Sequence, residues 1–302
     1  MDVASLYPSL MIRYNLHSRN IADPQKFVNI YHERLELKKK KDPLQAVLKI
    51  VLNSTYGVLK DKNNDLYDPL MSNKVCVYGQ ILLLDLIEHI EPYAQLIQSN
   101  TDGILIKMPD GQDEEEWFNL IDDIAWEWEQ RTGLTLEFDE YRKVFQKDVN
   151  NYIIVAPDGH IKSKGAYVKK LSNLDYGDFP IVNHALVEYM VKNVPVERFI
   201  HNCDELKEFQ MVTKITSKYS TILHGDEPIK EKCIRVFAST RETDAGVKKV
   251  SIRTGKPEKI ASSPEHCFMF NENMTDVRCP AYLDKDWYVE LVKKRLKDFG
   301  VI

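Results

Sequence analysis

Helical periodicity dominates the first part of the chain. Apolar residues recur every three or four positions in several stretches, the spacing that gives a helix one apolar face. The stretches that show it are residues 25–41, 44–56, 74–91 and 113–132. Asp42-Pro43 separates the first two, because proline disfavours helical backbone in the residue before it. The sequence therefore predicts a short helical hairpin followed by two further helices.

Short apolar runs between turn-forming residues predict strands. Residues 93–99 and 103–108 are two such runs, and Asn100-Thr101-Asp102 lies between them. They predict a hairpin with an aspartate at its tip. Strands are also expected at 134–145 and 151–156.

The two ends of the chain show weaker patterns. Residues 2–14 begin as a polar-apolar segment, turn at Pro8 and continue as a short helix, since proline suits a helix start. From about residue 171 the pattern is mixed and more helical, and a clear helix follows Asp284. Helices combined with a small antiparallel sheet predict the α+β class.

The composition is that of a folded protein in a reducing compartment. The chain has 302 residues, 43% of them hydrophobic and 29% charged, which is ordinary for a globular protein. Its five cysteines form no C-x-x-C pair, so neither zinc nor a disulfide framework is indicated. The longest apolar runs, such as residues 81–84, are too short to cross a bilayer, and the N-terminal residues show no basic region followed by an apolar run, so we do not expect secretion. We therefore expect a cytoplasmic protein without membrane contact, in a bacterial cell or a phage-infected host.

The net charge of −5 argues at first against nucleic-acid binding. Twelve acids and one base fall within residues 110–140, however, and the rest of the chain holds 34 acids and 40 bases. Phosphate binding needs a local positive face rather than a positive total. The charge is segregated, so the composition does not exclude a nucleic-acid partner.

Three short segments carry the candidate chemistry. They are Asp2-x-x-Ser5-Leu6-Tyr7-Pro8-Ser9, Lys49-x-x-x-Asn53-Ser54-x-Tyr56-Gly57 and Asn100-Thr101-Asp102. Each alone has an ordinary structural explanation: a solvated terminal aspartate, a glycine at a helix end, and a turn. Fixed residue types at fixed spacing and in fixed order are a stronger signal than any one segment.

Together the three segments resemble motifs A, B and C of family B DNA polymerases. Asn151-Tyr152, Lys162 and Lys164-Gly165 resemble the family's tyrosine-containing strand and lysine-glycine turn, and residues 283–289 resemble its final thumb helix. The likeness implies an antiparallel-sheet palm, a short helical-hairpin fingers insertion and a mixed, mostly helical thumb. The implied domains are palm at 1–24 and 63–170, fingers at 25–62 and thumb at 171–302.

The implied activity is that of a template-directed DNA polymerase core, which adds deoxynucleotides to a primer 3′-hydroxyl. Phosphoryl transfer needs charge neutralisation and in-line positioning, which two divalent ions about 3.5–4 Å apart provide. Magnesium prefers carboxylate oxygens and water. The resemblance makes Asp2 and Asp102 the catalytic metal ligands for two Mg²⁺ ions, with Mn²⁺ as an alternative ion and the Val3 carbonyl as a further ligand. Asn100 departs from the family's usual aspartate, which lowers the local negative charge.

The helical hairpin is expected to bind a nucleoside triphosphate. Arg34 and Lys38 lie four residues apart, hence on one helix face, and Lys49 begins the facing surface of the second helix. Arginine gives forked phosphate contacts and lysine acts as a point charge. Because Lys38 begins a run of four lysines, its register is ambiguous, and we interpret residues 39–41 as a solvated helix end.

Other nucleotide contacts follow from the resemblance. The backbone amides of Ser5 and Leu6 are expected to cradle phosphates at a helix start. Tyr7 matches the family's sugar-packing tyrosine, which leaves no room for a ribose 2′-hydroxyl. Asn53 and Tyr56 match positions at the nascent base pair.

The expected partners are primer–template DNA and deoxynucleoside triphosphates. The residues assigned to DNA are Gly57, Thr101, Tyr152, Lys162 and Lys164. These residues are expected to contact the sugar-phosphate backbone of the DNA, and such contacts carry no sequence information.

The family's exonuclease region and the palm strand before motif A have no counterpart in this sequence. We interpret the chain as a fragment (a split gene product, a mis-called start or an engineered piece), with a separate N-terminal exonuclease chain as a partner. Lys38 and Lys49 are only eleven residues apart. So short a fingers hairpin resembles phage and plasmid polymerases of the protein-primed type, which suggests a phage or mobile element as the source.

Two alternatives stay open at this point. The chain could be a non-catalytic remnant that binds primer–template DNA, as the missing strand and Asn100 suggest. It could also be another palm enzyme, such as a reverse transcriptase or primase, but those would lack Lys-x-x-x-Asn-Ser-x-Tyr-Gly.

Overall fold

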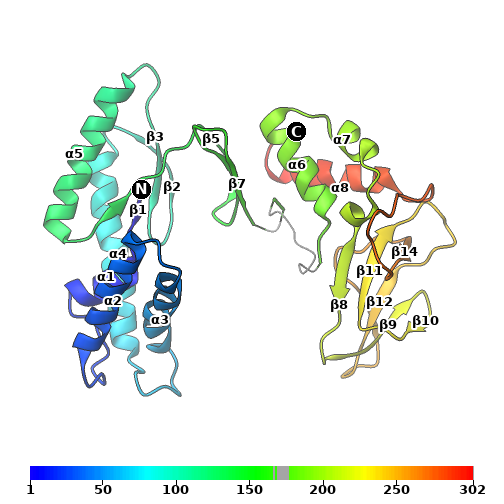
Figure 1. Cartoon of the computed structure of the whole chain (residues 1–302), viewed down its shortest axis with the longest axis horizontal. Helices are drawn as coiled ribbons and strands as arrows, with labels where there is room; N and C mark the ends of the chain where they lie inside the picture. The colour runs from blue at the N-terminus through cyan, green and yellow to red at the C-terminus, as the bar shows by residue number, and fades with distance from the viewer. Residues whose placement is uncertain (166, 169–176, 302) are drawn as a thin grey trace. The chain divides into compact units, whose positions relative to one another are not determined.

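The computed structural model describes residues 1–165, 167–168 and 177–301. The chain divides into two units, Met1–Asp139 and Glu140–Ile302, each with its own hydrophobic core. Figure 1 draws the first unit from blue to green and the second from green to red. The division into palm, fingers and thumb stays a prediction, and its boundary at 170/171 lies outside the described residues.

Helices make up most of the first unit. They are α1 (Leu6–Arg13), α2 (Pro24–Lys39), α3 (Leu44–Val58), α4 (Pro69–Ile90) and α5 (Glu114–Thr132). Capping fixes several of their ends, because a side-chain oxygen before the helix satisfies an otherwise unpaired amide. Asp23, Asp68 and Asp113 accept such bonds from Gln25, Met71 and Glu116. The cap at Asp68 explains why α4 begins five residues before the predicted start.

A small antiparallel sheet lies beside these helices. Its strands are β1 (Asp2–Val3), β2 (Gln95–Ser99), β3 (Ile104–Lys107) and β4 (Leu136–Glu137). β2 pairs with β3 and β1 pairs with β4. A bridge between Asp2 and Gly103 joins the two pairs, so that β1 lies between β3 and β4. The predicted hairpin with Asp102 at its tip is confirmed.

Helix α4 is the one helix in the described residues that is long and apolar enough to cross a membrane. Its window has a mean hydropathy of 1.3 and is 28% buried within the structure. The uninterrupted apolar runs of the sequence were too short to predict a membrane-spanning segment, so this helix differs from that expectation. Length and composition are weak evidence, because core helices of soluble proteins have the same properties. The buried residues Val75, Leu83 and Leu86 belong to the core of the first unit.

The described residues of the second unit form three antiparallel sheets. One joins β5 (Lys143–Asp148), β6 (Asn151–Val155) and β7 (Ile161–Lys164), and another has the order β14-β11-β8. The third has the order β10-β9-β12-β13. The remaining bounds are β8 Met211–Lys214, β9 Tyr219–His224, β10 Glu227–Ile229, β11 Cys233–Ala238, β12 Val247–Ser251, β13 Pro257–Lys259 and β14 Cys267–Met269.

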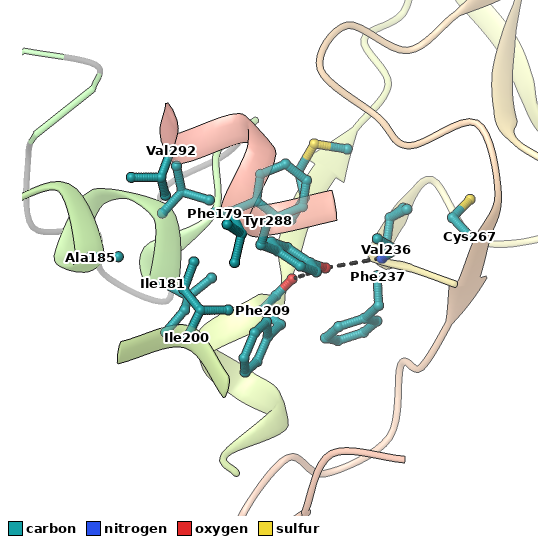
Figure 2. Packing of buried hydrophobic residues seen from close by; sticks show 14 of the residues in the cluster. Phe179, Ile181, Ala185, Ile200, Phe209, Val236, Phe237, Cys267, Tyr288 and Val292 are labelled. Atoms are coloured by element: carbon teal, nitrogen blue, oxygen red, sulfur yellow. Dashed lines mark hydrogen bonds between the residues drawn. The ribbon is translucent and has the colours of Figure 1, made fainter. Parts of the chain in front are cut away.

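Three α-helices and one short 3-10 helix complete the described part of this unit. They are α6 (Pro180–Lys192), α7 (Val196–Asn202), η1 (Leu206–Phe209) and α8 (Lys285–Asp298). Figure 2 shows the core between them, where the Tyr288 hydroxyl forms two hydrogen bonds among apolar side chains. Tyr288 donates to the Phe209 carbonyl at 2.9 Å and accepts from the Ala238 amide at 3.0 Å.

The α+β class with small antiparallel sheets is confirmed. Two expectations differ in detail. The predicted strand 134–145 is interrupted, since β4 ends at Glu137 and β5 begins at Lys143. Residues 177–301, the described part of the predicted thumb, contain seven strands as well as helices, which is more β-structure than a mostly helical thumb implies. Strands of three to six residues are too short for their period to stand out from a helical one.

Candidate active site

The first predicted metal-binding aspartate, Asp2, lies on β1, and the second, Asp102, lies in the turn just before β3. The Val3 amide donates to the Asp102 carbonyl at 2.6 Å, and Asp2 pairs with Gly103. On the same side, the Ile104 amide donates to the Met1 carbonyl at 2.9 Å. These contacts align β1 with the hairpin, so the sheet brings Asp2 beside the tip that carries Asp102.

Gly103 allows this close approach. A Cβ added at position 103 would overlap Oδ1 of Asp2 and would lie 2.5 Å from the Met1 carbonyl oxygen. No side chain larger than hydrogen fits there without moving the aspartate. Gly103 therefore leaves the space that the Asp2 carboxylate occupies, although the sequence analysis assigned it no role.

Both aspartates are exposed to solvent. At the tip of the hairpin, the Asn100 amide donates to the Gly103 carbonyl at 2.7 Å, and Asn100 Oδ1 accepts from the Thr101 amide at 2.9 Å. Asn100 thus closes the turn that presents Asp102. Thr101, assigned to DNA, is exposed at the same tip.

A potential phosphate site lies at the start of α1. Ser5 precedes the helix in a left-handed conformation with φ of 54°, which is uncommon for residues other than glycine. Its hydroxyl accepts a hydrogen bond of 2.5 Å from Nη1 of Arg34. Arg34 is only 5% exposed, and its Nε has no hydrogen-bond partner in the described part of the chain. A helix N-terminus beside a buried, incompletely paired guanidinium is suited to bind an anion.

The two lysines predicted for the same site differ in their surroundings. Lys49 is exposed on α3, as is Asn53 one turn later. Lys38 instead forms an ion pair with Glu137 of β4. Glu137 is the residue directly opposite Asp2 in the β1–β4 ladder. The structure therefore gives Lys38 a carboxylate partner, next to the candidate catalytic aspartate, that the sequence did not predict.

Tyr7 and Tyr56 form a stacked pair. Their ring centroids are 4.1 Å apart and their planes differ by 28°. Burial raises the pKa of the Tyr7 phenol, and the neighbouring Tyr56 and Cys76 raise it further. Tyr7 comes from α1 and Tyr56 from α3, so the stack joins two of the predicted motifs.

The remaining DNA candidates lie on different elements. Gly57 is exposed near the end of α3. In the second unit, Tyr152 of β6 is paired with Lys164 of β7, whose Nζ lies 5.7 Å from the tyrosine ring centroid. Lys162 is an exposed neighbour on β7. Together Tyr152, Lys162 and Lys164 give this sheet two cations and an aromatic ring.

Metal binding by side chains alone would rest on few ligands. Within the described residues, no group of three or more His, Cys, Asp or Glu side chains is arranged to hold a metal ion. Two carboxylates nevertheless fit magnesium, which commonly keeps several waters and takes substrate phosphates as ligands.

Three residues of this site were missed by sequence reasoning: Gly103, Cys76 and Glu137. Gly103 directly follows the third motif, so its proximity to Asp102 was a usable signal. The partners of Glu137 and Cys76 are distant in sequence, and no local pattern identifies them.

Comparison with known proteins places these features in context. No family model matches the chain. DNA polymerase 1 of Sulfurisphaera ohwakuensis is 25% identical over 291 residues, which cover 86% of this chain and 30% of that protein. DNA polymerase 1 of Sulfolobus acidocaldarius is 28% identical over 265 residues, covering 80% of this chain and 29% of the relative. A family B DNA polymerase structure from Pyrobaculum calidifontis aligns with all of this chain and 44% of its own, with a TM-score of 0.60 and 15% identity.

The chain is homologous to archaeal DNA polymerases and has the fold of a family B enzyme. It spans about 30% of the length of these curated relatives. A DNA polymerase of Acidianus bottle-shaped virus is also similar, at 32% identity over 84 residues, or 27% of this chain and 12% of that protein. None of these names describes a protein-primed enzyme, so the comparisons give that expectation no support.

Proposed function

We propose that this chain is the nucleotidyl-transfer core of a template-directed DNA polymerase. It would add deoxynucleotides to a primer 3′-hydroxyl by two-metal phosphoryl transfer. The observation that carries the proposal is the position of Asp2, on β1, beside the hairpin turn that carries Asp102; the 2.6 Å bond from the Val3 amide to the Asp102 carbonyl joins the two segments. Exposed carboxylates at one edge of a sheet are what hard divalent ions require.

In this proposal Asp2, Asp102 and the Val3 carbonyl hold two Mg²⁺ ions, for which Mn²⁺ could substitute. When bound, the ions would activate the primer hydroxyl and stabilise the leaving pyrophosphate. The protein's own contribution is to hold the two carboxylates in place, and Gly103 supports this because it leaves space for the Asp2 side chain. Asn100 contributes the turn that positions Asp102.

The triphosphate would bind at the start of α1. The amides of Ser5 and Leu6 would face the phosphates, and Arg34 is already oriented there through its bond to the Ser5 hydroxyl. Lys49 and Lys38 would add charge from the helical hairpin, with Lys38 first leaving Glu137. Partial neutralisation of phosphate charge by arginine and lysine is the usual way such sites bind.

The stacked tyrosines would select the sugar. A Tyr7 ring held against Tyr56 leaves little space for a 2′-hydroxyl, so deoxynucleotides would bind better than ribonucleotides. Asn53 would lie at the nascent pair. Tyr152, Lys162 and Lys164 would bind the primer–template duplex through its phosphates, without reading its sequence.

Primer extension with magnesium tests this function directly. Asp102→Ala should reduce extension by at least about a thousandfold, because losing a metal ligand removes several kcal/mol of transition-state stabilisation. Asp110→Ala is the matched control: Asp110 is an exposed acid paired with Lys107, and its removal should leave extension unchanged. Binding of Mn²⁺, followed by electron paramagnetic resonance, should weaken in Asp102→Ala and not in Asp110→Ala.

Two outcomes would count against the proposal. Extension by Asp102→Ala at the wild-type rate would remove Asp102 from the chemistry. A wild-type chain that binds the duplex but extends no primer would favour the non-catalytic remnant instead.

The separate exonuclease chain, the phage source and the cytoplasmic location stay predictions.

A further inference from the structure

Tyr56 is held by two residues that the proposed reaction does not use. Its hydroxyl lies 2.8 Å from Sγ of Cys76 on α4, within hydrogen-bond distance. Nζ of Lys60 lies 5.2 Å from the centroid of the Tyr56 ring and 4.0 Å from the same sulfur. The ring is therefore held at its hydroxyl by a thiol and over its face by a cation.

The third contact of Tyr56 is the stack with Tyr7. Cys76, Tyr56 and Tyr7 thus form a continuous series from α4 through α3 to α1. A shift of the Tyr56 ring would remove the surface against which Tyr7 rests. The position of the Tyr7 ring consequently depends on Cys76, which acts on it through Tyr56.

Helix α4 is a firm base for this series. Val75, next to Cys76, is fully buried. Gly79, less than one turn after Cys76, lies against α1. A Cβ at Gly79 would come within 3.3 Å of the Leu10 side chain, so the two helices are closely packed. Close packing of this kind leaves Cys76 little freedom to move.

We propose that Cys76 is a positioning residue that sets how strictly the nucleotide site excludes ribonucleotides. It fixes Tyr56 through its hydroxyl, and Tyr56 in turn fixes the ring of Tyr7. This inference rests on the proposed function, because it assumes that Tyr7 meets the sugar. Lys60 supports the same ring from its face.

The test compares two substitutions at one position. Cys76→Val keeps the approximate size and removes the hydrogen bond, whereas Cys76→Ser keeps a hydroxyl that can replace the thiol. The quantity measured is the ratio of kcat/KM for dATP to that for ATP in primer extension. We expect Cys76→Val to lower this ratio about three- to tenfold, in line with the loss of one hydrogen bond. Cys76→Ser should stay within about twofold of wild type.

Controls separate positioning from general damage. Cys233→Val, at an exposed cysteine of the second unit, should leave the ratio unchanged. In Cys76→Val the ratio should fall mainly because ATP is used better, which a loosened fold would not produce. An unchanged ratio in Cys76→Val, or an equal loss in Cys76→Ser, would overturn the inference.

A binding measurement keeps this test independent of catalysis. Dissociation constants for dATP and ATP, measured by calorimetry with Ca²⁺ in place of Mg²⁺, should show the same change in ratio. A wild-type chain that prefers dATP in binding but extends no primer would count against the proposed function alone. A wild-type chain that binds both nucleotides equally would overturn the role given to Tyr7 and, with it, the role of Cys76.

Discussion

The two units differ in what they leave exposed. Of the twenty large apolar side chains that are exposed in the described residues, seventeen lie in the first unit and three in the second. The first unit also exposes its candidate catalytic residues, Asp2 and Asp102. The second unit instead surrounds a fully buried tyrosine, Tyr288, whose hydroxyl satisfies two backbone groups.

This contrast indicates that chemistry and stability are carried by different parts of the chain. The carboxylates proposed to bind metal face solvent, so they contribute little to the packing around them. A buried polar group contributes to stability because it pairs with groups that water cannot reach. Without it, those groups would have no hydrogen-bond partner in the core. Substitutions in the second core should therefore change stability with little effect on the site, and substitutions at the site should do the reverse.

Tyr288→Phe should produce the largest effect on stability. It leaves the Ala238 amide and the Phe209 carbonyl without a partner inside the core, which costs about 2–4 kcal/mol. Hydrogen exchange measured peptide by peptide reports the two units separately. Protection should fall across residues 140–302 and stay unchanged across residues 1–139.

Tyr282→Phe is the matched control for this change. Tyr282 packs at the edge of the same core and is only partly buried, so its variant should stay within about 0.5 kcal/mol of wild type. Equal loss of protection in both units after Tyr288→Phe would break the contrast, since it would make the two cores one cooperative structure.

Gly103→Ala should have an intermediate effect, on activity rather than stability. The added methyl group would overlap the Asp2 carboxylate and displace it from the hairpin. A displacement of about 1 Å in a catalytic group can cost about a hundredfold in rate, so primer extension should fall about ten- to a hundredfold. The exchange protection of the second unit should not change.

Gly111→Ala provides the comparison for Gly103→Ala. Gly111 has φ of 84° but open space around it, so alanine there strains a loop without touching Asp2. Its extension rate should match wild type. A Gly103→Ala chain with full activity would show that Asp2 does not need the position it has in this structure.

The sequence predicted the first unit better than the second. The helices at 25–41, 44–56 and 113–132 were placed to within a few residues, because each repeats its apolar spacing over three turns or more. Strand β12, Val-Lys-Lys-Val-Ser, has no clear alternation and pairs with β9, about 25 residues away. Such strands are fixed by their partners, and the local residue pattern of one strand does not show which partner it has.

The candidate site shows the same limit. Asp2 and Asp102 were found because each lies in a short segment whose residue types and order are distinctive. Whether those segments form an active site in this chain stays a prediction, supported by the position of β1 beside the hairpin turn that carries Asp102. Lys38 and Glu137 are 99 residues apart in the sequence, and nothing near either residue indicates the other.

Glu137→Gln should have the smallest effect and the most informative sign. The ion pair with Lys38 is about half exposed at both side chains, so it is worth less than about 1 kcal/mol. If Lys38 must leave Glu137 to reach a triphosphate, removing the carboxylate charge should tighten nucleotide binding about two- to fivefold. Calorimetric titration with dATP measures this, and Glu36→Gln, which removes the exposed partner of Lys39, is the control that should change nothing.

Weaker binding in Glu137→Gln would mean the opposite arrangement, in which Glu137 orients Lys38 toward the nucleotide. Unchanged binding would place Lys38 outside the site and would confine the phosphate contacts of the first unit to Arg34, Lys49 and the start of α1.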